Sequence, residues 1–160
     1  MSELRIGLGV DAHALEDGVP LVLGGVAIDH PRGLAGHSDG DVIAHALVDA
    51  LLGAAGLGDI GSLFPSGDER WEGAVSLDLL RDAYAQVREA GFALVNADCV
   101  LIGEEPRIAE HREEMRRSLA AALGVAPERV NVRATTTDRL GFTGRGEGLA
   151  AQAVALLERA

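Results

Sequence analysis

Apolar and polar residues alternate along residues 4–13 with the period of two that is typical of a β-strand. The apolar positions are Ile6, Leu8 and Val10, and the opposite positions are Gly7, Gly9, Asp11 and His13. The two glycines leave the second face of this strand open for another group to approach. Further apolar runs predict a tight hairpin over residues 21–28 and two more strands, over residues 92–102 and 130–135.

A loop over residues 36–41, which contains Gly36 and Gly40, precedes a segment whose apolar residues have the spacing of a helix. Apolar residues then recur every three or four positions as far as Ala54, which predicts a helix that packs on a core. Asp41, His45 and Asp49 recur every four residues and form a separate polar stripe on this helix. The polar residues of the loop are candidates to cap its start. We therefore expect His45 to face the preceding loop.

Three further helices are predicted. Ser76 should cap the first of them. The second should follow the turn over residues 103–107, with Pro106 near its first turn, and should end at Gly124. The last should cover residues 149–157. The order of strands and helices predicts the α/β (α+β) class, with helices covering a four-stranded mixed sheet.

Composition narrows the possible partners. The chain has 160 residues, which fits one domain over residues 1–160. Its formal net charge of −11 disfavours nucleic acid, because proteins that bind nucleic acid carry a basic surface. An anionic small molecule fits if metal ions and a few arginines offset its charge locally. The single cysteine, Cys99, lies in an apolar run and is expected to be a buried, inert thiol. No apolar run is long enough to span a membrane and no signal-peptide pattern is present, so we expect a cytoplasmic protein.

One carboxylate and two imidazoles form a candidate metal site. Asp11 and His13 lie on one face of the predicted strand, and a helix can deliver His45 to the same place. This ligand set suits zinc with an open fourth position. The spacing alone leaves an alternative open, because an Asp-x-His pair is common and a histidine on a helix is more often a satisfied surface or core group.

Two loops offer groups that bind phosphate or a nucleobase. The turn over residues 103–107 leads into a predicted helix, whose free amides attract an anion or the edge of a base. The loop over residues 136–148 offers threonine hydroxyls, two arginines and Asp138, a hard oxygen ligand for Mg²⁺ or Mn²⁺. The alternatives are a turn that merely connects two elements and a flexible glycine loop with capping threonines.

Asp59 and Phe142 each allow two interpretations. Asp59, between glycines, can bind a hydroxyl pair of a ribose or can stabilise a turn. Phe142, in the glycine-rich loop, can anchor that loop to the core or insert into an interface. We favour the interface for Phe142.

Seven segments together resemble the 2-C-methyl-D-erythritol 2,4-cyclodiphosphate synthase family. They are residues 9–13 (GVDAH), 36–41 (GHSDGD), 49–55 (DALLGAA), 58–61 (GDIG), 64–65 (FP), 134–137 (ATTT) and 140–148 (LGFTGRGEG). The similarity covers nearly the whole chain, and the motifs at 36–41 and 140–148 are highly specific in combination.

The resemblance implies a reaction of the non-mevalonate isoprenoid pathway. The substrate would be 4-diphosphocytidyl-2-C-methyl-D-erythritol 2-phosphate, whose 2-phosphate attacks the β-phosphorus of the diphosphate. The products would be the cyclic diphosphate and CMP, which makes the enzyme a phosphorus–oxygen lyase. The family is a homotrimer with active sites between subunits, so the same assembly is expected here.

Roles for individual residues follow from the resemblance. Zinc would be bound by Asp11, His13 and His45, and a second divalent ion, Mg²⁺ or Mn²⁺, by Asp138. The catalytic groups that stabilise the transition state would be His37 and Thr136. The substrate-binding residues would be Ser38, Asp59, Ile60, Gly61, Asp68, Gly103, Pro106, Arg107, Ala134, Thr135, Thr137, Phe142 and Arg145. Within this set, residues 103–109 with Thr135 match the cytidine pocket, and Phe142 and Arg145 match positions near the threefold axis.

The chain departs from the family pattern at a few positions. Asp138 stands where the family usually has Glu, Arg139 where Lys is common, and Glu72 where Lys is often found. Ser66 and Gly67 replace a usual Asp-Thr pair. Two other functions remain possible: a metal-dependent phosphoesterase that uses a bound water as nucleophile, and a non-catalytic sensor of a nucleotide or an isoprenoid diphosphate. The presence of His37, Thr136 and the whole zinc set disfavours the sensor.

Overall fold

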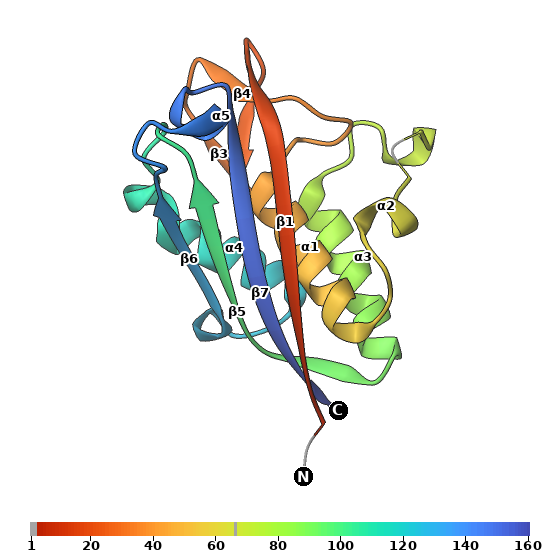
Figure 1. Cartoon of the computed structure of the whole chain (residues 1–160). Coiled ribbons are helices and arrows are strands. Elements are labelled where there is room, and N and C mark those ends of the chain that lie inside the picture. The colour runs from red at the N-terminus through yellow and green to blue at the C-terminus, as the bar shows by residue number, and fades with distance from the viewer. Residues whose placement is uncertain (1–2, 66) are drawn as a thin grey trace.

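The computed structural model describes residues 3–65 and 67–160. Figure 1 shows a main sheet in which most strands are long, with the main helices packed against one of its faces. Its five strands run in the order β4 (Arg32–Leu34), β1 (Leu4–Asp17), β7 (Gly148–Arg159), β5 (Phe92–Ile102) and β6 (Val130–Thr135). Neighbouring strands are antiparallel except for β5 and β6, which are parallel. The α/β class and the mixed sheet are confirmed, but the sheet has five strands and not the expected four.

The longer helices are α1 (Val42–Ala55), α3 (Ser76–Glu89) and α4 (Arg112–Leu123). The short helical segments are α2 (Ile60–Leu63), η1 (Glu69–Trp71), η2 (Ala109–His111), η3 (Pro127–Arg129) and α5 (Gly141–Gly144). The predicted hairpin forms a separate pair of strands, β2 (Leu21–Leu23) and β3 (Val26–Ile28). Within the described ranges, no helix has the length and apolar character needed to cross a membrane.

The additional strand is β4, which lies at the edge of the sheet. It pairs with the last part of β1, where Leu15 lies opposite Leu34. This pairing extends β1 past His13, the predicted end of the strand, to Asp17. A strand of three residues that includes a glycine carries too little alternation to be recognised from sequence.

The predicted helix over residues 149–157 is wrong, because this segment is β7, the central strand of the sheet. Its side chains alternate between a buried face and a more open one. The buried face holds Leu149, Ala151, Ala153, Ala155 and Leu157, whereas Gln152 and Val154 are exposed. Alanine favours a helix in isolation, but pairing with β1 on one side and β5 on the other overrides that preference.

Helix α1 lies directly on β1 at two glycines. A Cβ atom on Gly9 would stand 1.8 Å from the carbonyl oxygen of Ala46, and Gly7 meets the helix backbone in the same way one turn further along. The face that these glycines leave open is therefore filled by α1. Since Asp11 follows on the same strand and His45 precedes Ala46, this contact also brings the two predicted ligands together.

The face of the sheet opposite the helices carries exposed apolar side chains on β1 and β7. They include Ile6 at 73%, Leu8 at 63%, Val10 at 55% and Val154 at 38%. These residues come from β1 and β7, which are adjacent strands, so they form one stripe, called here the outer stripe. An exposed apolar stripe of this kind often marks a surface that contacts another protein.

Asp41 caps α1 and is fully buried. Its carboxylate accepts hydrogen bonds from the backbone N–H groups of Ala44 at 3.1 Å, Gly24 at 2.9 Å and Gly25 at 2.7 Å. Burial raises the pKa of Asp41 to about 6, although these N–H donors oppose the shift. The residue thus joins the β2–β3 hairpin to the start of α1 and has a structural role.

Two predicted helix starts are wrong. Ser76 does not cap α3, because Val75 occupies the cap position and Ser76 is the first helical residue. Pro106 does not lie in the first turn of α4, which begins at Arg112 after the short turn η2. Residues 103–108 form a loop instead. Cys99 is fully buried in β5, as predicted.

Candidate functional site

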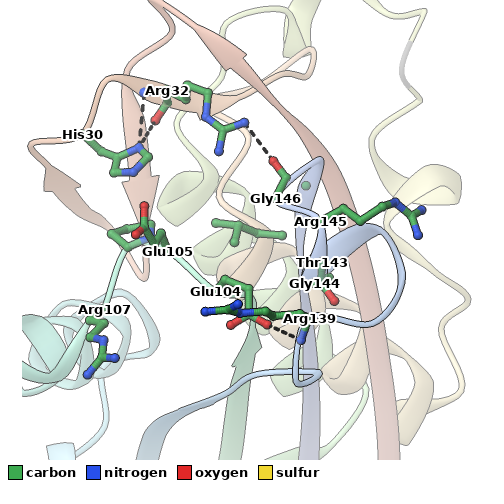
Figure 2. Close-up of a pocket in the computed structure, with 13 residues that line it drawn as sticks. His30, Arg32, Glu104, Glu105, Arg107, Arg139, Thr143, Gly144, Arg145 and Gly146 are labelled. Carbon is green, nitrogen blue, oxygen red and sulfur yellow. Dashed lines mark hydrogen bonds between the residues drawn. The ribbon is translucent and has the colours of Figure 1, made fainter.

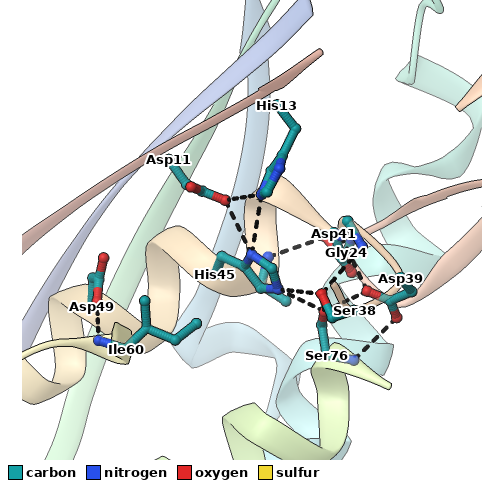
Figure 3. A network of polar contacts seen from close by, with 12 residues as sticks. Asp11, His13, Gly24, Ser38, Asp39, Asp41, His45, Asp49, Ile60 and Ser76 are labelled. Atoms are coloured by element: carbon teal, nitrogen blue, oxygen red, sulfur yellow. Dashed lines mark hydrogen bonds and ion pairs between the residues drawn. The ribbon is translucent and has the colours of Figure 1, made fainter. Parts of the chain in front are cut away.

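Two residues of β1 and one of α1 converge at one point, as Figure 3 shows. Oδ2 of Asp11 lies 2.8 Å from Nε2 of His13 and 3.1 Å from Nδ1 of His45. The two ring nitrogens are 3.4 Å apart. One ligand atom from each residue lies within 4.8 Å of the others, which is an arrangement that can hold a metal ion. The three predicted ligands are therefore brought together and are called here the triad.

The donor set of the triad fits a divalent cation. A carboxylate oxygen and two imidazole nitrogens are ligands that zinc and similar metals prefer. Three lone pairs that point at one another repel unless a proton or a cation lies between them. His45 is 8% exposed, so bulk water screens this repulsion poorly. A proton or a cation must therefore lie between the atoms of the triad.

Electrostatics keep the carboxylate of the triad ionised. Burial alone would raise the pKa of Asp11, but the hydrogen bonds and charges of His13 and His45 outweigh it and lower this pKa to about 2. The hydrogen bond to Asp11 in turn raises the pKa of His13, against the effect of burial. A proton on an imidazole can neutralise Asp11 in the absence of metal, and a bound cation would replace that proton.

Each imidazole also makes a contact outside the triad. His13 makes a backbone hydrogen bond with Ala35. Nε2 of His45 lies 2.8 Å from the hydroxyl oxygen of Ser76 and 3.0 Å from that of Ser38. Both rings are therefore held in place before any ligand binds, which favours a defined metal geometry.

A cavity of about 430 Å³ opens in front of the triad. Besides the triad, the predicted site residues in its wall are His37, Ser38, Ile60 and Gly61. The other lining residues are Phe64, Pro65, Gly67 and Leu79. His37 is exposed and presents an imidazole to solvent at this cavity. We call this space the triad cavity.

Asp59 and Asp68 do not line the triad cavity. Asp59 caps α2 and accepts hydrogen bonds from the N–H and the hydroxyl of Ser62, at 2.9 and 2.8 Å. Asp68 caps η1 and forms an ion pair with Arg70 at 2.6 Å. The turn-stabilising role that the sequence left open for Asp59 is thus present. Ser66, one of the departures from the family pattern, lies outside the described residues.

A second cavity, of about 300 Å³, lies where β5 and β6 end. Six predicted site residues line it: Gly103, Pro106, Arg107, Ala134, Thr135 and Thr136. The remaining lining residues are Leu101, Glu104, Ile108, Ala109 and Arg112. The walls combine backbone and small side chains with the charged side chains of Glu104, Arg107 and Arg112, which suits a flat polar group such as a base. We call this space the turn cavity.

A third cavity, of about 620 Å³, adjoins the turn cavity and is rich in arginine, as Figure 2 shows. The two cavities share Glu104, Pro106 and Arg107. Arg32, Arg139 and Arg145 also line the third cavity. Nη1 of Arg32 donates a hydrogen bond to the carbonyl oxygen of Gly146 at 2.8 Å, which fixes its guanidinium. This side of the acidic protein is therefore locally basic.

The glycine-rich loop carries the last predicted residues. The hydroxyl of Thr137 donates to the carbonyl oxygen of Leu140 at 2.6 Å, so this threonine holds the loop together. Asp138 is exposed and has a φ of 56°, in the left-handed region. Arg145 forms an ion pair with Glu147 at 3.0 Å. Phe142 is 42% exposed and is therefore not an anchor in the core of one chain.

The triad cavity and the turn cavity have no lining residue in common among the described residues. His37 and Thr136, the two predicted catalytic residues, lie one in each. A single chain thus presents two separate parts of the predicted site, and it does not bring them together.

Three features of the site were missed from sequence. Ser76 contacts His45 although the sequence suggested only a cap, and Asp39 holds Ser76 across 37 positions of the chain. Arg32 joins the basic cavity from the edge strand β4. The residues next to Ser76 and Arg32 in the sequence do not indicate these long-range contacts. The density of polar residues over 36–41 was the one feature of the sequence that pointed to them.

Comparison with known proteins agrees with these features. The model of the YgbB family matches residues 4–158. A relative from Rubrobacter xylanophilus, named 2-C-methyl-D-erythritol 2,4-cyclodiphosphate synthase, is 63% identical over 100% of this chain and 98% of its own length. The bifunctional IspDF from Campylobacter jejuni has a similar structure, with a TM-score of 0.96 and 44% identity over 100% of this chain and 43% of that one. A solved 2C-methyl-D-erythritol-2,4-cyclodiphosphate synthase in a CDP-bound form gives a TM-score of 0.87 at 42% identity, and covers 96% of this chain and 99% of that one.

Proposed function

Because the chain belongs to the 2-C-methyl-D-erythritol 2,4-cyclodiphosphate synthase family and is therefore an enzyme of the isoprenoid pathway, we propose the following reaction for it. It converts 4-diphosphocytidyl-2-C-methyl-D-erythritol 2-phosphate to 2-C-methyl-D-erythritol 2,4-cyclodiphosphate and CMP. An oxygen of the 2-phosphate forms a bond to the β-phosphorus, and the bond from that phosphorus to the oxygen of CMP breaks. The reaction class is that of a phosphorus–oxygen lyase.

The observation that carries this proposal is the triad at the wall of a cavity, on the same chain as a separate turn cavity beside four arginines. The substrate needs one place for its diphosphate and another for its cytosine. Its nucleophile is its own phosphate, so no nucleophilic side chain is required. Positioning and charge neutralisation are then the main tasks of the protein.

Asp11, His13 and His45 would hold zinc, with one coordination position left for the substrate. Bound zinc would supply Lewis-acid polarisation of a phosphate oxygen. Asp138 would hold the second ion, Mg²⁺ or Mn²⁺, through its exposed carboxylate. The left-handed backbone at Asp138 suits aspartate better than most residues, which is consistent with the shorter side chain at this position.

His37 and Thr136 would act as the catalytic groups by donating hydrogen bonds to phosphate oxygens where negative charge grows. The triad cavity would bind the erythritol phosphate half, through Ser38, Ile60 and Gly61 and the nearby turns of Asp59 and Asp68. The turn cavity would bind the cytidine half, through Gly103, Pro106, Arg107, Ala134 and Thr135, with Thr137 supporting the strand end. Arginines of the adjoining basic cavity would offset the phosphate charge.

A homotrimer would complete the site. The outer stripe of Ile6, Leu8, Val10 and Val154 offers an apolar surface for assembly, and the half-exposed Phe142 and Arg145 would lie toward the threefold axis. In a cyclic head-to-tail assembly, the triad cavity of one subunit can meet the turn cavity of its neighbour. This arrangement supports the proposal because one chain keeps the two cavities apart.

The proposal is tested by incubating zinc-loaded protein with the diphosphocytidyl substrate and Mg²⁺, and by identifying both products by mass. We expect the cyclic diphosphate and CMP in equal amounts. A linear phosphate product, which carries the mass of an added water, would identify a phosphoesterase and overturn the cyclase. Unchanged substrate that stays bound would identify a sensor.

A further inference from the structure

His45 is held on both of its ring nitrogens, and the second contact has no part in the function proposed so far. Nδ1 faces Asp11 and His13, whereas Nε2 faces a buried serine on another helix (Figure 3). We infer that Ser76, itself held by Asp39, is a positioning residue that fixes the tautomer and the orientation of His45 for metal binding. This inference rests on the proposed metal site.

Ser76 is placed to accept a hydrogen bond from His45 and does not merely fill space. It is fully buried at the first turn of α3, and its hydroxyl oxygen lies 2.8 Å from Nε2 of His45. If Nε2 carries the ring proton and donates it to this oxygen, Nδ1 keeps its lone pair free on the side of the triad. A histidine whose protonated nitrogen is committed in this way is a better ligand, because no reorientation or tautomer change is needed when the metal binds.

Asp39 decides which way the serine hydroxyl points. Its carboxylate accepts hydrogen bonds from the hydroxyl of Ser76 and, at 3.0 Å, from the backbone N–H of the same residue. It also accepts from the backbone N–H of Asp41 at 3.1 Å. Because the hydroxyl proton of Ser76 is directed at Asp39, its lone pairs are directed at His45. Carboxylate, hydroxyl and imidazole thus form a chain that leads to the triad.

Ser38 contacts the same nitrogen but is less suited to this role. Its hydroxyl oxygen lies 3.0 Å from Nε2 of His45, yet Ser38 is only partly buried and lines the triad cavity, where a ligand would compete for it. Ser76 is 0% exposed and does not line this cavity, so a ligand there does not compete for its hydroxyl. The corresponding partner of His13 is the backbone at Ala35 and not a side chain.

The test measures metal binding and does not depend on turnover. Zinc is removed with a chelator, and the affinity for Zn²⁺ is measured by competition with a chromogenic chelator. We expect Ser76→Ala to bind Zn²⁺ about 10- to 100-fold more weakly than the wild type, the range typical when a partner of a metal ligand is removed. Ser118→Ala, the same change on α4 away from the triad, should bind as the wild type does.

Asp39→Asn is the second variant, since it keeps the shape of the residue and removes its charge. We expect it to weaken Zn²⁺ binding as well, but to add less than about a twofold loss when Ser76 is already alanine, because Asp39 acts through that hydroxyl. Co²⁺ loaded in place of Zn²⁺ should show shifted visible absorption bands in Ser76→Ala and unshifted bands in Ser118→Ala.

The affinities for Zn²⁺ distinguish an error in the positioning role of Ser76 from an error in the metal site. Equal affinity in the wild type and Ser76→Ala, or losses that multiply in the double variant, would overturn the positioning role while leaving the metal site intact. If Ser76→Ala does not fold, an affinity of Asp39→Asn for Zn²⁺ equal to that of the wild type would also overturn the positioning role. Wild-type protein that binds no Zn²⁺ would overturn the proposed metal site and, with it, this inference.

Discussion

His13 and His45 present different ring nitrogens to each other, with Nε2 of His13 lying 3.4 Å from Nδ1 of His45. His13 is on strand β1 and His45 is on helix α1. His13 also makes a hydrogen bond with the backbone at Ala35, and Nε2 of His45 contacts the hydroxyl of Ser76. The two rings are therefore oriented before a cation arrives.

The first prediction concerns metal content. Protein purified without chelator should contain about one zinc ion per chain, and His45→Ala should contain almost none, because two ligands on one strand do not close a site. Elemental analysis gives both values. His111→Ala, which changes a histidine beside Glu110 and away from the triad, is the control and should keep its zinc. Equal zinc in wild type and His45→Ala would exclude His45 as a ligand.

The second prediction concerns the contact between β1 and α1. Gly9→Ala should lower the free energy of unfolding by about 3 kcal/mol or more, because the new methyl group would overlap the backbone of Ala46 and push the helix away. Gly53→Ala is the matched control, since a Cβ atom there meets nothing within 4 Å, and it should raise stability by about 0.5–1 kcal/mol. Urea unfolding measures both. A Gly9→Ala protein as stable as the wild type would mean that helix and strand are not in contact at this point.

The third prediction concerns the second cation. Asp138→Glu should lower the Mg²⁺ or Mn²⁺ concentration needed for half-maximal activity, because the longer side chain reaches further into the site and replaces water in the shell of the ion. Asp138→Asn, which keeps the length and removes the charge, should raise that concentration. Titration of activity with each metal gives the comparison. An unchanged or higher requirement in Asp138→Glu would count against Asp138 as a ligand.

The fourth prediction concerns the assembly of the site. His45→Ala removes a triad ligand and Thr136→Ala removes a hydroxyl of the turn cavity, so each variant alone should have little activity. In randomly mixed trimers, roughly a quarter of the interfaces would join an intact triad to an intact turn cavity. Co-expressed variants with two different tags should therefore regain a sizeable fraction of activity. Mixed trimers that are no more active than their parents would show that both halves act within one subunit.

The ligands of the site could be predicted from sequence because they are set by local patterns. Asp11 and His13 share a face through the alternation of a strand, and His45 follows from helical spacing after a loop dense in polar residues. The tight turn at Gly24 and Gly25 was equally visible. Such patterns relate residues that are close together in the sequence. Because Ser76 and Asp39 are 37 positions apart, their contact could not be predicted in this way.

The errors in the predicted fold share a physical cause. An alanine-rich segment has a helical preference of its own, and only the presence of β1 and β5 on its two sides makes residues 148–159 a strand. The three residues of β4 likewise form a strand only because the end of β1 lies beside them. In both cases the partner lies far away in the sequence, so no local window contains the information.

The position of β7 has a consequence for the speed at which the chain folds. β1 and β5 do not pair with each other, because β7 lies between them and bonds to both. Leu4 lies opposite Glu158, so the two ends of the described sequence must meet before the sheet can close. Contacts between such distant residues form slowly, since the entropy of closing a long loop is lost before the contacts compensate for it. The β4–β1 and β5–β6 pairs should therefore form earlier than the whole sheet, and insertion of β7 should be the slow step of refolding.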